Sequence, residues 1–417
     1  MKEKSKSSDT ERSQLSHSLK SFFVRQSPMF GRRVSSVSSA GLNSKVVHDE
    51  EEFHLDPFLQ GGLRLGLISG DQLVFVQLCS HDVFVEPLFS FKSASGADQV
   101  NLKQFVATNY GTVQVSGSTM STYPMSRNLR EGSPVCDTFA MEVLQECCVS
   151  LCVADGCGWG KKSLDASVQA SSAFLDYIRS QSSTAVHQNL KVEFILLRAL
   201  AKAHERIMDR AIDGGTTTLI GGVLLPFSTA FQFSFVSIGD CKAFLRIAET
   251  GEFVDLNSHN RAHCRDSKDP GGRIGFCDKD GEPDLRNLFV GKCFCSFGDL
   301  LFLMSDGVSD NFDPELQGCL PSDCGFDGVS CWDDMADASS VKSKWCCLKL
   351  AEIVGEVDVS FLDTNVVVQK LITYCKDLTK SSREFLESFH GQKLPSDFKN
   401  YPGKMDHSTC VCVSLTK

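Results

Sequence analysis

The chain has 417 residues, of which 42% are hydrophobic and 23% charged, a balance that excludes a fibrous or wholly disordered protein. Its formal net charge of -10 disfavours nucleic acid and anionic membrane as main partners, because both repel an acidic surface. No stretch reaches the roughly 18 uninterrupted apolar residues of a membrane helix, so we expect no membrane span.

The N-terminal segment, residues 1–50, is predicted to be a disordered Ser-rich tail. Its first 40 residues contain 12 serines and few large apolar residues, too few to offset the entropy lost on ordering. Two short segments, Gln26-Ser27-Pro28 and 32–35, resemble kinase sites, which makes the tail a candidate kinase target. Ordered structure is expected from residue 53 to 417.

The first ordered segments predict strands. Apolar runs at 63–68 and 73–78 flank Gly70-Asp71, which is typical of a hairpin. Residues 94–134 are polar and rich in turn residues and predict no clear element. A further strand-like run covers 143–154.

The rest of the chain alternates between helical and strand patterns. Apolar residues recur at helical spacing over 164–178 and 190–211, and the second pattern stops before Gly214. The later predictions are strands at 217–225, 231–238, 243–247, 288–290 and 300–304, an inserted loop at about 313–347, helices at 348–354 and 366–375, and a last strand at 409–415. This order does not fit alternating βαβ units, and it favours antiparallel sheets packed between helices.

The 19 cysteines form no CxxC motif, so the usual spacing of a tetrahedral zinc site is absent. We therefore expect free thiols in a reducing compartment, cytoplasmic or nuclear. A looser set, Cys319, Cys324 and Cys331, is a weaker candidate for a metal site.

Acidic residues at the predicted strand ends indicate a different metal chemistry. Asp155, Asp306 and Asp406 each adjoin an apolar run, and Asp137 lies upstream of all three. Aspartates that are remote in sequence can meet where neighbouring strands end. Hard divalent cations prefer such oxygen ligands, and a pair of ions can activate water and clamp a phosphate.

Six segments resemble, in order, motifs of the metal-dependent type 2C protein serine/threonine phosphatase family. They are VADGCGWG at 153–160, GTTT at 215–218, VSIGDCKA at 236–243, GGRI at 271–274, FLMSDGVSD at 302–310 and GKMDHST at 403–409. The resemblance covers about residues 133–416. It implies an α+β fold, an α-β-β-α sandwich of two antiparallel sheets flanked by helices.

The resemblance also implies two Mg²⁺ or Mn²⁺ ions per domain. Asp155 would bridge both ions, the backbone carbonyl of Gly156 would bind one of them, and Asp306 and Asp406 would bind the other. Asp137 would fill an upstream acidic position. The implied reaction is hydrolysis of phosphoserine and phosphothreonine in phosphorylated proteins by a metal-bridging hydroxide.

One further residue, Asp213, lies near the family's accessory metal aspartate and is carried over as a candidate ligand. The acidic residues predicted to bind metal would then come from several separate segments of the chain.

The chain departs from the family at the proton donor and at the phosphate clamp. Cys157 replaces the histidine after Asp-Gly, and His407 follows the last aspartate in place of Asn or Asp. Either residue is a candidate proton donor, although packing is the commoner role for such a histidine. The family's phosphate-gripping arginine has no clean match, which leaves Arg127 and Arg130 as candidates.

Three functions stay open at this point. The first is an active phosphatase of weak or specialised activity. The second is a pseudophosphatase that uses its surface or the 313–347 loop to hold a partner. The third, and least favoured, is a redox sensor in which Cys157 is a low-pKa thiolate beside a metal.

Overall fold

The computed structural model describes residues 64–67, 87–93, 99–108, 110–144, 148–181, 192–210, 214–227, 230–258, 269–278, 280–355 and 363–417. The predicted N-terminal tail with its kinase sites and the predicted strand 73–78 lie outside these residues. No helix among the described residues is both long and apolar enough to cross a membrane.

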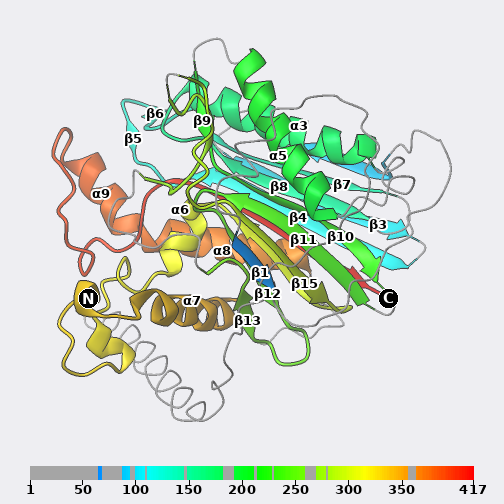
Figure 1. Ribbon diagram of the computed structural model, residues 1–417. Coiled ribbons are helices and arrows are strands. Elements are labelled where there is room, and N and C mark those ends of the chain that lie inside the picture. Colours follow the sequence, from blue (N-terminus) through cyan, green and yellow to red (C-terminus); the bar gives the residue numbers. More distant parts are fainter. Residues whose placement is uncertain are drawn as a thin grey trace, which may run out of the picture.

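Two sheets lie face to face between helices (Figure 1). In the described part of the chain, the first sheet has the strand order β1 (Arg64–Leu67), β15 (Phe289–Cys295), β11 (Ala230–Ile238), β10 (Leu219–Phe227), β8 (Val149–Asp155), β7 (Asp137–Val143) and β2 (Phe89–Lys92). The second has the order β13 (Phe253–Asp255), β12 (Lys242–Arg246), β16 (Leu300–Met304), β17 (His407–Thr416), β4 (Gly111–Ser121) and β3 (Gln99–Thr108). Neighbouring strands are antiparallel, except that β1 runs parallel to β15.

Helices cover the outer face of each sheet. On the first sheet lie α3 (Lys161–Gln181) and α5 (Val192–Arg210), and on the second lie α7 (Ala338–Val354) and α8 (Thr364–Leu378) (Figure 1). The remaining elements are short: β5 (Met125–Ser126) with β6 (Leu129–Arg130), β9 (Thr216–Thr217) with β14 (Ile274–Gly275), α6 (Asp306–Ser309), α9 (Lys380–Ser388), and single 3-10 turns at Asp310–Phe312, Pro321–Cys324 and Trp332–Asp334. The predicted α-β-β-α sandwich is confirmed.

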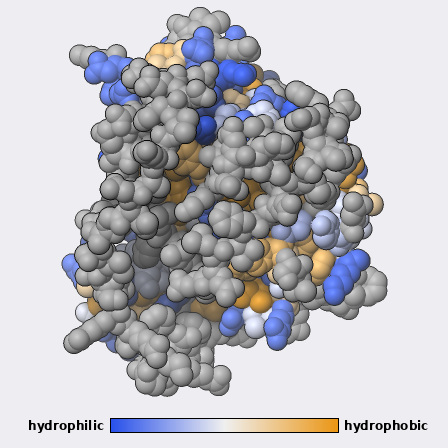
Figure 2. Space-filling model, turned by 45° about the vertical axis from the view of Figure 1, so that its right-hand side comes forward, coloured by the Kyte–Doolittle hydropathy of each residue, from blue (hydrophilic) through white to orange (hydrophobic). Residues whose placement is uncertain are grey.

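The hydrophobic core follows this layering. One buried cluster fills the space between the sheets and contains Phe139, Phe233 and Phe235. A second lies under α3 and α5, and a third lies under α7 and α8. Figure 2 shows hydrophobic residues toward the middle of one face of the molecule, with hydrophilic residues mainly along its upper and lower margins.

The structure corrects several sequence predictions. Residues 94–134 contain the long β3–β4 hairpin. The predicted strand at 143–154 begins only at Val149, as β8, because Val143 ends its partner strand β7. The predicted loop at 313–347 ends early because α7 begins at Ala338. The first strand of the predicted N-terminal hairpin exists as β1 and pairs with β15.

The cysteines in the described residues are free thiols. Cys319 and Cys324 are buried in a small cluster with Trp332, whereas Cys331 is exposed. Among the described residues these three cysteines do not come together as a metal site.

Candidate metal centre

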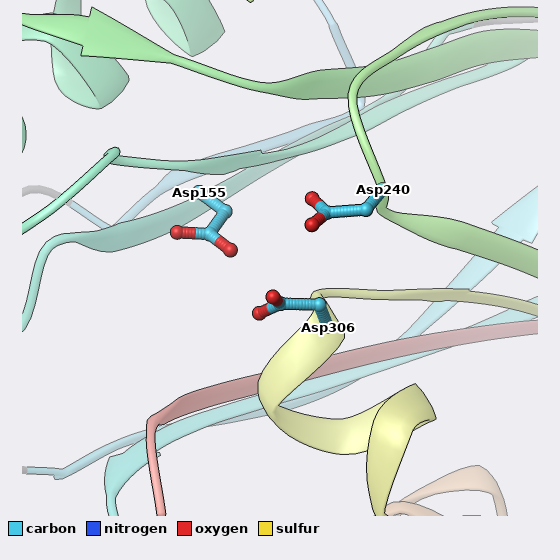
Figure 3. A group of neighbouring side chains, drawn as sticks. All are labelled: Asp155, Asp240 and Asp306. Carbon is cyan, nitrogen blue, oxygen red and sulfur yellow. The ribbon is translucent and has the colours of Figure 1, made fainter. Parts of the chain in front are cut away.

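Three carboxylates converge at one edge of the sandwich. Asp155 ends β8, Asp240 lies in the loop between β11 and β12, and Asp306 begins α6. Figure 3 shows their side chains pointing toward one another. One carboxylate oxygen from each lies within 4.8 Å of the others, a spacing that a single metal ion could span. The structure thus brings together Asp155 and Asp306, which the sequence analysis proposed as metal ligands, with Asp240, which it did not propose.

The backbone around Asp155 is held by the neighbouring β9 segment. The Asp155 carbonyl oxygen accepts hydrogen bonds from the Thr218 backbone N–H at 2.9 Å and from the Thr217 hydroxyl at 2.7 Å. The next residue must be glycine, because a Cβ on Gly156 would lie 2.4 Å from the Ser163 carbonyl oxygen. This contact explains why the Asp-Gly pair, rather than the aspartate alone, carries the motif.

Asp240 is positioned by a tight turn. Gly239 has a φ of +96°, which favours glycine, and a Cβ there would lie 2.3 Å from Thr218. The Asn287 side chain fixes this turn by accepting from the Gly239 N–H and donating to the Gly239 carbonyl oxygen, both at 2.9 Å. Asp240 is 4% exposed.

Asp306 is held by contacts between α6 and β17. The Ser305 N–H donates to the Thr409 carbonyl oxygen at 2.9 Å, and the Thr409 N–H donates to the Ser305 hydroxyl at 2.9 Å. Asp306 is 5% exposed, and its Oδ1 has no hydrogen-bond partner among the described residues. A buried carboxylate oxygen of this kind needs a cation or a proton.

Asp137 faces Asp155, one of the three converging carboxylates, across the β7–β8 ladder. Neither of its oxygens makes a hydrogen bond of normal geometry with the described residues, although the Ser305 and Thr409 hydroxyls are close enough to lower its pKa. Burial outweighs them and, with the charges of Asp406 and Asp306, raises the pKa of Asp137 to about 7.

The other carboxylates act on Asp155 in the same way. Its removal from solvent, followed by the negative charges of Asp137 and Asp306, raises the pKa of Asp155 well above its usual range. This concentration of negative charge favours the binding of either protons or a divalent cation. Carboxylate oxygens are the ligands that Mg²⁺ and Mn²⁺ prefer, so Asp155, Asp240 and Asp306 fit one such ion.

Asp406 has a different environment. Its Oδ1 accepts from the Tyr123 hydroxyl and from the His407 N–H, both at 2.9 Å. Its Oδ2 lies 2.9 Å from Lys404 Nζ, and the same ammonium also donates to Asp306 Oδ2. The family resemblance implies a second metal ion between Asp306 and Asp406. This region already contains the Lys404 ammonium, so it does not fit a second metal ion.

The two candidate proton donors lie in unfavourable surroundings. Burial raises the pKa of the Cys157 thiol to about 12, which makes it a poor acid at neutral pH and does not favour a low-pKa thiolate. His407 is 3% exposed; its Nδ1 accepts from the Cys136 N–H at 3.2 Å, and its ring packs edge-on against Tyr123. These contacts favour a packing role for His407.

The candidate phosphate-binding arginines lie on the small β5–β6 hairpin. Arg127 is exposed at its turn, and Arg130 donates to the Tyr123 carbonyl oxygen at 2.7 Å. The sequence analysis did not single out Arg273, whose positive charge lowers the pKa of Cys157 and whose Nε is buried without a hydrogen-bond partner in the described structure. The GGRI motif at 271–274 was the signal available for it. Asp213 lies outside the described residues.

A cavity of about 220 Å³ adjoins the carboxylates. Asp240 and Asp310 line it on the side of the metal centre, and Trp332 and Lys342 line it on the side of the 313–347 segment. Lys342 lies over the Trp332 ring at 5.3 Å and pairs with Asp313 at 3.3 Å.

Comparison with known proteins agrees with these features. The family model described as protein phosphatase 2C matches residues 126–341, just over half of the chain. The PP2C-like domain-containing protein CG9801 of Drosophila melanogaster is 30% identical over 209 residues, which is 48% of this chain and 29% of that protein. The chain thus spans under a third of the length of this curated relative.

The solved structures to which the chain is similar include two phosphatases. The serine/threonine phosphatase PstP/Ppp of Mycobacterium tuberculosis has 14% identity and a TM-score of 0.42, with 73% of this chain and 99% of that chain covered. The photosystem II phosphatase PBCP has 15% identity and a TM-score of 0.44 over the same shares.

Proposed function

Because this chain belongs to the protein phosphatase 2C family, we propose that it hydrolyses phosphoserine and phosphothreonine in proteins with the help of Mg²⁺ or Mn²⁺. The observation that carries the proposal is the convergence of Asp155, Asp240 and Asp306 within 4.8 Å. A divalent ion bound there would activate water and neutralise charge on the phosphoryl group. The protein's part is to hold that ion and to orient the phosphate.

The residues around the carboxylates suit this task. Asp155 is the last residue of β8 and Asp306 is the first residue of α6, so both are positioned by regular elements. The buried Asp137, which faces Asp155 across the β7–β8 pair, is a further carboxylate whose ionised form a nearby cation would stabilise. The backbone carbonyl of Gly156, next to Asp155, is a further candidate oxygen ligand.

Arg273 is our candidate for the phosphate clamp. Its guanidinium is the positively charged group that acts on Cys157, beside the carboxylates, and its buried Nε is an available donor. An arginine there would offer a phosphate charge-assisted hydrogen bonds of the kind that bind phosphates strongly.

The proposal is tested with p-nitrophenyl phosphate and a phosphothreonine peptide in the presence of millimolar Mn²⁺. We expect turnover that stops when the metal is chelated and falls at least about 100-fold in Asp306→Asn, which weakens an ion ligand at nearly constant volume. The matched control is Asp327→Asn, because Asp327 is exposed in the 313–347 segment. Turnover that survives chelation would contradict the proposal.

A second function, a pseudophosphatase that binds phosphoproteins without turnover, is favoured by two observations. The Cys157 thiol is a poor acid, and a lysine lies between Asp306 and Asp406. In this case a labelled phosphothreonine peptide would bind, measured by fluorescence anisotropy, while no phosphate is released. Phosphate release by folded wild-type protein would exclude it.

A further inference from the structure

Lys404 is built into the acidic centre by its own backbone. Its N–H donates to Asn311 Oδ1 at 2.8 Å, and its carbonyl oxygen accepts from Asn311 Nδ2 at 3.0 Å. Asn311 is fully buried, and the preceding Gly403 has a φ of +83° with no room for a Cβ against Asn311. The chain is therefore held on both sides of the point from which the lysine side chain extends.

The ammonium group lies among three carboxylates. It donates to Asp306 Oδ2 and lies 2.9 Å from Asp406 Oδ2 and 3.4 Å from Asp310 Oδ2. An ammonium has three N–H donors and no acceptor, so its hydrogen-bonding capacity matches these three partners. Only 15% of the lysine side chain is exposed, and replacing it with water would leave the carboxylates close together without compensation.

We propose that the Lys404 ammonium takes the place of the second divalent ion, so that this centre holds one divalent cation and one built-in ammonium. Asp306 divides its two oxygens between them: Oδ2 faces the ammonium, and Oδ1, which has no hydrogen-bond partner among the described residues, stays available for the ion shared with Asp155 and Asp240. A second divalent ion would have to enter beside a fixed positive charge.

The two kinds of cation are not equivalent in chemistry. An ammonium offsets the repulsion between Asp306 and Asp406, but it cannot coordinate a water or a phosphoryl oxygen. This centre is the ion site of the proposed function, and the replacement of one ion by an ammonium would make that function weak or specialised. The number of ions bound does not depend on turnover.

The test counts Mn²⁺ ions bound per full-length chain by equilibrium dialysis, with free Mn²⁺ measured by its electron paramagnetic resonance signal. We expect one ion in the wild type and two in Lys404→Met. Lys404→Gln, which retains hydrogen bonding without the charge, should also bind two. The control Lys393→Met, at an exposed position, should bind one.

Two ions or none in the wild type, or the same count in the wild type and both Lys404 variants, would overturn the inference. Circular dichroism shows whether each variant is folded; if neither folds, the wild-type count alone decides, with one ion in favour and any other number against. A chain that binds one ion and releases no phosphate would sink the proposed function and leave this inference standing.

Discussion

Asp137 and Asp155 face each other across a strand pair, and two further carboxylates, those of Asp240 and Asp306, converge on Asp155. Burial and the negative charges of neighbouring aspartates raise both pKa values, that of Asp137 to about 7. Such groups bind protons more tightly in the folded chain than in the unfolded chain, where the pKa of an aspartate is about 4.

This shift predicts a pH dependence of stability. Because the pKa of Asp137 is higher in the folded chain, protonation of Asp137 stabilises the fold. This contribution is fully present below about pH 4 and is lost as the pH rises to about 7. The free energy of unfolding without divalent ions should therefore decrease over this window, as measured by urea denaturation. Mn²⁺ should reverse the decrease at pH 7, and Asp137→Asn should flatten it. A stability that increases from pH 4 to 7 would contradict this account.

Arg273 is expected to bind the phosphate of the substrate directly. Loss of a charge-assisted hydrogen bond to phosphate costs about 1.5–3 kcal/mol, so Arg273→Ala should raise KM for a phosphothreonine peptide at least about tenfold. Arg127→Ala, at an exposed turn, should change KM little. Steady-state kinetics of both variants decide between the two arginines, and an unchanged KM in Arg273→Ala would remove it as the clamp.

The sequence singled out most of these aspartates, but it did not show which of them would contact a metal ion and which would contact the Lys404 ammonium. Asp155 and Asp306 were recognisable because each ends an apolar run next to glycine. Asp240 follows a strand and a glycine in the same way, yet it was not taken as a ligand. The direction of the Lys404 side chain depends on Asn311, which is 93 residues away in the sequence, so no local pattern could reveal it.

Elements with strong periodicity were predicted well. The helices α3 and α5 follow the apolar spacing at 164–178 and 190–211 because one face of each packs on the first sheet. The β3–β4 hairpin was missed because β3 lies at a sheet edge, where polar side chains are tolerated. Because β7 was not predicted as a strand, the pairing of Asp137 with Asp155 could not be predicted either.

A buried ion pair joins β7 to α3. Glu142 on β7 has no exposed side-chain surface, and it accepts from Arg179 near the end of α3, with Nε at 2.9 Å. Removal of the arginine would leave a buried carboxylate without its cation. Arg179→Ala should therefore lower the free energy of unfolding by roughly 3–5 kcal/mol.

The matched control is Lys380→Ala in α9, which breaks the exposed pair with Glu384 and should cost less than about 1 kcal/mol. Urea denaturation of both variants gives the comparison. Equal losses in the two variants would show that the Glu142 pair does not fasten α3 to the first sheet.

The described part of the chain is a two-sheet sandwich, and the carboxylates of the candidate metal centre lie at one edge, where both sheets contribute. Asp155 comes from the first sheet, Asp306 follows β16 of the second, and Asp240 lies in the loop that passes from one sheet to the other. This arrangement explains why the order of the motifs along the chain predicted the layers, since each motif marks a strand end that the fold must bring together. The order could not predict how many ions the centre holds.

The most direct measurement is a calorimetric titration of Mn²⁺ into the wild type and Asp155→Asn, with circular dichroism to show that both are folded. Asp155 converges with both Asp240 and Asp306, so its loss should abolish the binding heat while Asp327→Asn retains it. A folded wild type without binding heat, or an Asp155→Asn variant that binds Mn²⁺ as the wild type does, would contradict the existence of a metal centre here.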